Sequence, residues 1–270
     1  MGSRVYFLVA LAFYAVAALS ALVLFLARKR TLGGATSLPT FIGFVVHTAG
    51  LSQRWTEAGH FPATGAHDVS SFLAWTMVLA FLTASFRSKV EGLGETVHPV
   101  AFALLLVSIL TNPSNSPDPM LRGLFMPVHT SLAAFGYGAL FVNFTMAVLY
   151  LLQERDLRAR TPRLFYYAGP SLDRCDRVGG TSAIVGFSFL TLAVVTGFLW
   201  NHVVRGHVWT GDPKEWTGLA AWFTYAGLVA LRHRSGWGGR RGAWIGIAGF
   251  AIVVFTFAYA SVFAGLLGRK

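Results

Sequence analysis

Long apolar runs divide this chain, with short polar stretches between them, and this division constrains the fold more than any other feature. A membrane-spanning helix needs about 20 mostly apolar residues. Hydrophobic residues make up 54% of the chain and charged residues only 12%, whereas a soluble domain carries about 25% charged residues. We therefore predict an all-α, polytopic integral membrane protein with one membrane domain over residues 1–270. Eight transmembrane helices are expected, at Val5–Ala27, Leu38–Ser52, Ser71–Phe86, Pro99–Leu110, Val128–Leu152, Thr181–Trp200, Thr217–Leu231 and Ala243–Leu267.

Two further features bound the class of protein. The first apolar run has no small-residue cleavage site, so we expect a retained first span rather than a signal peptide. The single cysteine, Cys175, excludes an internal disulfide and a metal site built from cysteines.

The basic residues are distributed unevenly between the two sets of loops. With the N-terminus outside, 15 of the 22 Lys and Arg residues follow the first, third, fifth and seventh spans and face the cytoplasm, and seven face outwards. The positive-inside rule favours this orientation, which puts both termini on the outer, periplasmic side. Because this charge lies in loops beside a membrane, the net charge of +11 indicates contact with membrane lipid, and no nucleic-acid partner is expected.

The stretch from Trp200 to Trp216 (WNHVVRGHVWTGDPKEW) is predicted to be a loop at the outer face, and it is richer in functional side chains than a connector needs. Flat aromatic surface, imidazoles and cations together suit a planar, apolar, metal-containing ligand with anionic side groups, which describes heme. An interfacial aromatic belt is the alternative, but it explains only the tryptophans. The side chains concerned are Trp200, Trp209, Trp216, His202, His207, Arg205, Lys214, Asp212 and Glu215.

The predicted topology gathers five of the eight histidines at the outer surface, and His47 lies in the outer part of the second span. Of these, His129 opens a predicted helix just after Pro127, where free backbone N–H groups favour a neutral or metal-bound imidazole. His47 is a candidate because ionisable residues inside membranes tend to be functional, although a neutral imidazole bonded to a neighbouring helix remains open. The five histidines are His60, His67, His129, His202 and His207.

The sequence lacks the common catalytic signatures. No GxSxG, HExxH, phosphate-binding loop or GxGxxG with an acidic partner is present, so no catalytic residue is predicted. At most, the chain is expected to be one component of a heme-attachment system.

Three segments resemble the CcsA family of cytochrome c synthesis proteins (System II), part of a tryptophan-rich heme-handling group with CcmC, CcmF and HemX. The segment RWTEAGHFPATGAHDVSSFLAW (Arg54–Trp75) resembles the family's RW-x-x-SGHFP segment. The segment MPVHTSLAAFGYGAL (Met126–Leu140) resembles its span-opening VH segment. The segment GHVWTGDPKEWTGLAAWFTYAGLVALRHR (Gly206–Arg234) resembles its WDPKE loop and the helix that follows.

The resemblance implies eight helices in a bacterial inner membrane, and heme b held at the outer face for attachment to apocytochrome c. It also implies a possible CcsB-like partner protein. His129 matches the family's first outer heme ligand, and His233 matches the histidine at the inner end of the helix after the loop. Trp209 and Asp212 match retained loop positions.

This chain departs from the family pattern at several positions. Arg205 and Gly211 replace two of the loop tryptophans, and His67 and Asp68 replace a tyrosine and a glutamate. The histidine that follows the family's last helix has no counterpart in the printed sequence. Either His207, His67 or His60 substitutes as the second iron ligand, or outer heme presentation is lost, as in HemX-like members.

The resulting hypothesis is a heme-handling protein of cytochrome c maturation. His129 would bind iron, Trp209 would lie against the ring, and Arg54, Arg205 and Lys214 would pair with the propionates. Two alternatives stay open: a HemX-like membrane regulator of heme biosynthesis, and a scaffold subunit of a membrane electron-transfer complex.

Overall fold

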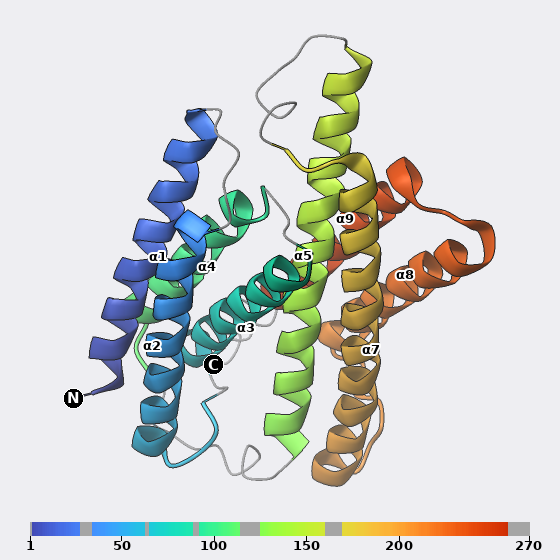
Figure 1. Ribbon diagram of the computed structural model, residues 1–270. Helices are drawn as coiled ribbons and strands as arrows, with labels where there is room; N and C mark the ends of the chain where they lie inside the picture. Colours follow the sequence, from blue (N-terminus) through green and yellow to red (C-terminus); the bar gives the residue numbers. More distant parts are fainter. Residues whose placement is uncertain are drawn as a thin grey trace.

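The computed structural model describes residues 2–27, 34–62, 65–88, 92–113, 125–159 and 169–258. Every regular element in these ranges is an α-helix, so the predicted all-α class is confirmed (Figure 1). The helices are α1 (Ser3–Leu26), α2 (Gly34–Ala58), α3 (Gly65–Ser88), α4 (Gly94–Leu110), α5 (Phe125–Arg158), α7 (Leu172–Arg205), α8 (Pro213–Ser235) and α9 (Gly239–Ala258).

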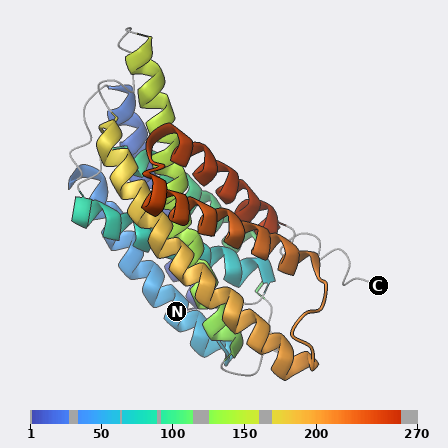
Figure 2. The same cartoon turned by 90° about the vertical axis from the view of Figure 1, so that its right-hand side faces the viewer.

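The helices form two groups that meet between α3 and α5. The first group holds α1 to α4, and the second holds α5, α7, α8 and α9 (Figure 1). Within the second group, α7, α8 and α9 run side by side (Figure 2). At the junction the backbones approach closely, since a Cβ atom on Gly138 of α5 would lie 2.8 Å from the carbonyl oxygen of Thr76 of α3. Small residues permit such close helix packing, on which association inside a membrane depends.

A buried polar stripe runs along α2 and explains why this helix is less apolar than its neighbours. Thr40, His47 and Arg54 follow at seven-residue intervals, which places them on one face of the helix, and all three are buried. Each bonds to another helix, as buried polar groups require. The contacts are Thr40 Oγ1 with His98 Nε2 at 2.9 Å, His47 Nδ1 with the Tyr14 hydroxyl at 3.2 Å, His47 Nε2 with Ser71 Oγ at 2.9 Å, and Arg54 Nε with Asp68 Oδ1 at 2.9 Å.

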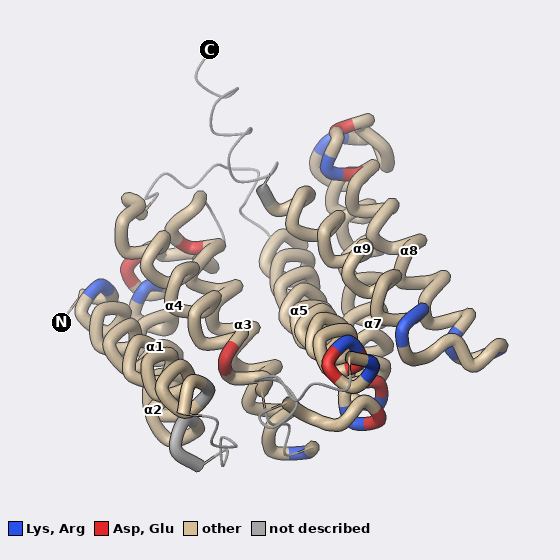
Figure 3. Tube along the Cα trace, turned by 90° about the horizontal axis from the view of Figure 1, so that it is seen from above, with Lys and Arg blue, Asp and Glu red and all other residues tan. Residues whose placement is uncertain are grey.

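Among the described residues, five helices are long and apolar enough to cross a membrane: α1, α3, α5, α7 and α9. The apolar helix α4 is shorter, at 17 residues. Seen from above, Lys, Arg, Asp and Glu are sparse along the helices and gather near their ends (Figure 3). The molecule is therefore a multi-pass membrane protein.

Two predicted loops are wrong in their extent, because polar residues there lie on helices. Most of Gln53–Ser70 is helical, since α2 continues to Ala58 and α3 begins at Gly65. Likewise, most of the predicted Trp200–Trp216 loop is helical, because α7 continues to Arg205 and α8 begins at Pro213. The loop itself is Gly206–Asp212, which we call the Trp loop from here on. In both places the fall in hydropathy predicted the end of the helix several residues too early.

Other boundaries also shift. The helix α4 begins at Gly94, so His98 lies inside it and is buried. Similarly, α5 begins by Phe125, which puts His129 in its second turn. Most of the stretch between the predicted fourth and fifth spans (111–127), the middle of the stretch between the predicted fifth and sixth spans (153–180) and the end of the predicted eighth span lie outside the described residues.

Candidate functional site

A cavity of ≈ 390 Å³ lies at one end of the second helix group, among the ends of α5, α7, α8 and α9. Its size falls within the range of about 300–1,000 Å³ that is usual for ligand sites. Most of its walls are apolar or aromatic. The lining residues are Val69 from α3; Met126, His129, Thr130, Ala133 and Tyr137 from α5; Leu190, Ala193, Val194, Gly197, Phe198, Trp200, Asn201 and Arg205 from α7; Thr210 and Asp212 from the Trp loop; Lys214, Glu215, Gly218 and Leu219 from α8; and Thr256 and Phe257 from α9.

His129 is held in a fixed orientation against α7. Its Nδ1 lies 2.8 Å from the carbonyl oxygen of Ala193, and because a carbonyl can only accept, Nδ1–H is the donor. The Nδ1 proton leaves the lone pair on Nε2, the nitrogen that can bind a metal. A backbone carbonyl behind a histidine is the usual outer partner of a metal ligand, where it fixes the tautomer and the ring orientation.

Gly197 makes room for this ring. A Cβ atom on Gly197 would lie 3.0 Å from Cε1 and 3.1 Å from Nδ1 of His129, which is tighter than an ordinary contact. The absence of a side chain at this position lets the imidazole lie between α5 and α7. The glycine therefore belongs to the histidine's environment.

Two cations line the same cavity from different helices. Arg205 is in the last turn of α7, with its guanidinium carbon 5.3 Å from the centre of the Trp200 ring. Lys214 is in the first turn of α8. An apolar chamber with one imidazole and two cations fits a heme, because the ring, iron and propionates each meet a suitable group.

The Trp loop is fastened to α8 by Glu215. The carboxylate accepts hydrogen bonds from the backbone N–H groups of Thr210 and Gly211 at 2.9 and 3.0 Å, and from the Thr210 hydroxyl at 2.6 Å. It also accepts one at 2.6 Å from Asn201 Nδ2 of α7. A single side chain thus joins α7, the loop and α8.

Asp212 caps the N-terminus of α8. Its side chain accepts a hydrogen bond from the Lys214 N–H at 2.9 Å, and Pro213 follows it as the first helical residue. This is the usual arrangement at the start of a helix. The predicted residue Asp212 therefore has a clear structural role, although it also lines the cavity.

Trp209 packs beside the cavity and does not line it. Its ring meets Trp216 edge-on, with centroids 4.9 Å apart, and lies 6.1 Å from the ring of Phe198, which does line the cavity. Trp209 is 37% exposed, so part of its face is available to a ligand or partner.

Three predicted site residues lie in the first helix group and do not line the cavity. His67 Nδ1 is 2.6 Å from the carbonyl oxygen of Ser108, at the end of α4. Arg54 forms a buried ion pair with Asp68, and His47 lies between two hydroxyl groups, those of Tyr14 and Ser71. Both ring nitrogens of His47 are therefore bonded to neighbouring helices, α1 and α3.

The remaining predicted residues lie on the surface. His207 is exposed in the Trp loop, and His233 is exposed in the last turn of α8, at the opposite end of that helix. All five histidines of the predicted outer cluster lie toward the end of the bundle that holds the cavity, but only His129 lines it.

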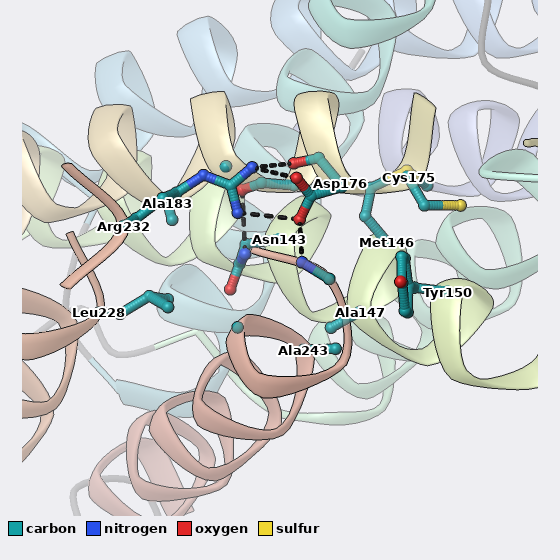
Figure 4. Close-up of a pocket in the computed structure, with 14 residues that line it drawn as sticks. Asn143, Met146, Ala147, Tyr150, Cys175, Asp176, Ala183, Leu228, Arg232 and Ala243 are labelled. Carbon is teal, nitrogen blue, oxygen red and sulfur yellow. Dashed lines mark hydrogen bonds and ion pairs between the residues drawn. The ribbon is translucent and has the colours of Figure 1, made fainter. Parts of the chain in front are cut away.

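At the end of the bundle opposite the cavity, an ionic latch joins three helices (Figure 4). Asp176 of α7 accepts from the Arg232 guanidinium of α8 at 2.6 and 3.0 Å and from the Gly239 N–H of α9 at 2.7 Å. Cys175 lies next to this latch and is buried. The latch holds fixed the far ends of the helices that enclose the cavity.

Sequence reasoning missed Asn201 and Gly197, and it read Glu215 only as a charge. The position of Glu215, three residues after an Asp at the start of a helix, is the signal that could have identified it. Nothing in the sequence marks Asn201 or Gly197, because their roles depend on contacts between helices.

The comparisons with known proteins agree with this architecture. The family model described as cytochrome C assembly protein matches residues 63–267. The cytochrome c biogenesis protein CcsA of Prochlorococcus marinus (strain MIT 9313) is 30% identical over 243 residues, covering 79% of this chain and 76% of its own. The CcsA protein of Trieres chinensis is 27% identical over 235 residues, which is 75% of each chain.

A solved structure shares the fold. The cytochrome c heme lyase CcmF superposes with a TM-score of 0.69 at 16% sequence identity. The match covers 98% of this chain and 48% of CcmF, so this chain spans about half of that protein. Since the family model covers well over half of the sequence, the chain belongs to the cytochrome c assembly family and is of the CcsA type.

Proposed function

We propose that this protein holds heme b in the cavity beside His129 and presents it for attachment to apocytochrome c. The main observation behind this proposal is that His129 lines an apolar cavity and has a nitrogen, Nε2, that can bind a metal. Arg205 and Lys214 lie in the wall of the same cavity. Family membership supports the same assignment, since it places the chain in cytochrome c assembly.

Each residue has a distinct part in the proposal. His129 Nε2 binds iron, and the Ala193 carbonyl holds the ring in place. Arg205 and Lys214 pair with the two propionates, and Phe198 and Trp200 contact the ring. Arg54 is no longer assigned to a propionate, because it is paired with Asp68 in the other helix group.

The thiols for attachment come from the partner. The only cysteine, Cys175, is buried at the end of the bundle opposite the cavity. Heme attachment therefore needs apocytochrome c to supply its thiols at the outer face. We further propose eight membrane crossings in a bacterial inner membrane, with both termini outside and a CcsB-like protein as a possible partner.

The second iron ligand is proposed to be His207. It lies in the Trp loop, two residues from Trp209, and Gly206 beside it has a φ of 74°, which is easily adopted only by glycine. The same loop contributes Thr210 and Asp212 to the cavity wall, so His207 lies on a segment that borders the cavity.

The test is hemin binding by purified variants. His129→Ala should abolish specific hemin binding, and His207→Ala should change the spectrum from low to high spin without loss of heme. The matched control is His202→Ala, which removes an exposed histidine from the last turn of α7 outside the cavity. Unchanged heme content and spectrum in His129→Ala would refute the proposal and leave the HemX-like or scaffold roles in its place.

A further inference from the structure

The cations in the cavity wall depend on one carboxylate for their relative placement. Arg205 ends α7 and Lys214 is the second residue of α8, so their separation is set by how the last turn of α7 lies against the first turn of α8. Glu215 is next to Lys214, and Asn201 is one turn before Arg205. The 2.6 Å hydrogen bond between Asn201 Nδ2 and Glu215 Oε1 joins these two turns directly.

The same carboxylate also fixes the Trp loop between the two helices. Its Oε2 accepts from the Thr210 and Gly211 N–H groups, and its Oε1 accepts from the Thr210 hydroxyl as well as from Asn201. The loop is bounded by Gly206 and contains Gly211, both in the left-handed region with open space where a Cβ would be. Backbone of this kind has little rigidity of its own, so the three hydrogen bonds from the loop to Glu215 supply it.

We propose that Glu215 is the positioning residue of this site, and that through Asn201 it sets the spacing of Arg205 and Lys214. The cavity then selects a planar ligand that carries two carboxylates over the same ligand with its carboxylates esterified. This inference rests on the proposed function and adds a basis for its selectivity. Asn201, Thr210 and Gly211 act with Glu215, and none of these residues binds the iron.

Hemin and hemin dimethyl ester are the two probes, since they share the ring and iron and differ only in the two charges. Wild-type protein should bind hemin at least about tenfold more tightly than the diester, because each charge-assisted hydrogen bond contributes substantially to binding. Glu215→Gln keeps the shape of the side chain but replaces one carboxylate oxygen by an NH₂ group, which cannot accept. One or two of the four hydrogen bonds are therefore lost, depending on the orientation of the amide, and the remaining ones lose the negative charge that strengthens them. Affinity for hemin should fall about tenfold and affinity for the diester should stay nearly constant.

A second variant and a matched control separate positioning from folding. Asn201→Leu removes the hydrogen bond between α7 and α8 and leaves an apolar side chain in the cavity wall, so it should lower the preference for hemin over the diester while the Trp loop stays attached to Glu215. Asp173→Asn removes an exposed carboxylate from the far end of α7, where it pairs with Arg177, and should keep the full preference. Thermal unfolding of all four proteins shows whether any variant is simply unfolded.

The loop is followed independently of heme by a spin label at Val208, which is 52% exposed. Glu215→Gln should mobilise this label in the absence of any ligand. If the label is mobile in Glu215→Gln but neither the wild type nor any variant binds hemin, the proposed function and the selectivity are both refuted. Glu215 would then be a loop anchor alone. An immobile label in Glu215→Gln, or an unchanged preference for hemin over the diester in that variant, would overturn the positioning role itself.

Discussion

Gly197→Ala is the sharpest test of how the fold prepares His129, because it adds one methyl group and removes nothing. The added Cβ would lie 3.0 Å from Cε1 and 3.1 Å from Nδ1 of the imidazole. An ordinary contact begins at 3.4 Å, so the ring must retreat by a few tenths of an ångström. Its movement is opposed by the 2.8 Å hydrogen bond from Nδ1–H to the Ala193 carbonyl, which lies one turn before Gly197.

The size of the effect follows from what the hydrogen bond does for a metal ligand. Loss of the outer partner of a metal-binding histidine lowers metal affinity by about 10- to 100-fold. A displaced ring weakens the bond without deleting it, so we expect the lower end of that range, about tenfold in Kd or 1.4 kcal/mol. The fold should not suffer, because alanine is favoured over glycine inside a helix by about 0.5–1 kcal/mol.

The assay is a hemin titration followed in the Soret band, together with a thermal melt. Gly227→Ala is the control, since it makes the same substitution within α8 at a position with nothing within 4 Å of the new Cβ and outside the cavity wall. The control should bind hemin as wild type does and melt at the same temperature or higher. Gly197→Ala protein that binds hemin with wild-type affinity and spectrum would refute the role given to His129.

Two other predictions concern stability and orientation. Asp68→Asn should lower the free energy of unfolding by about 3–5 kcal/mol, because it removes the carboxylate that forms a buried ion pair with Arg54. The double variant Arg54→Met, Asp68→Leu should recover most of this loss in the same melt, and a stable Asp68→Asn protein would contradict the reasoning. Val208→Cys should react with a membrane-impermeant maleimide in cells whose outer barrier has been opened, since Val208 is exposed and the native Cys175 is buried. The unsubstituted protein is the control for labelling of Cys175. Labelling of Val208→Cys only after lysis would reverse the proposed orientation.

The helices could be predicted from the sequence because membrane insertion leaves a strong signal in hydropathy. Their ends could not, and α2 shows the physical reason. A hydropathy scale counts each polar residue against a membrane helix. Arg54 nevertheless lies within α2, because Asp68 neutralises its charge across a helix interface. The same applies to His98, which is buried within α4 and bonded to Thr40. A sequence lists these residues but does not show which of them are paired.

The candidate site was predictable to the extent that its residues make local patterns. His129 was identified by its place at the start of a predicted helix, and Arg205 and Lys214 by their charge within the predicted loop Trp200–Trp216. The structure brings all three to one cavity. Grouping by membrane face also included His67 and Arg54, which lie at the same end of the molecule but in the other helix group. Topology assigns a residue to one face of the membrane, whereas a binding site also requires the right neighbours within that face.

The DPKE segment shows how one motif can hold a structural role and a functional one together. Asp212 and Pro213 start α8 by local rules that apply to any helix, and Glu215 would be read the same way from sequence alone. In the structure, however, Glu215 also reaches Asn201 on α7, a contact that capping does not require. Lys214 lies between Asp212 and Glu215 in the chain, so the geometry that starts the helix also sets the position of a cation in the cavity wall. A substitution that preserved the helix start but shortened Glu215 would keep α8 and lose the link to α7, which is why helix content alone cannot report on this site.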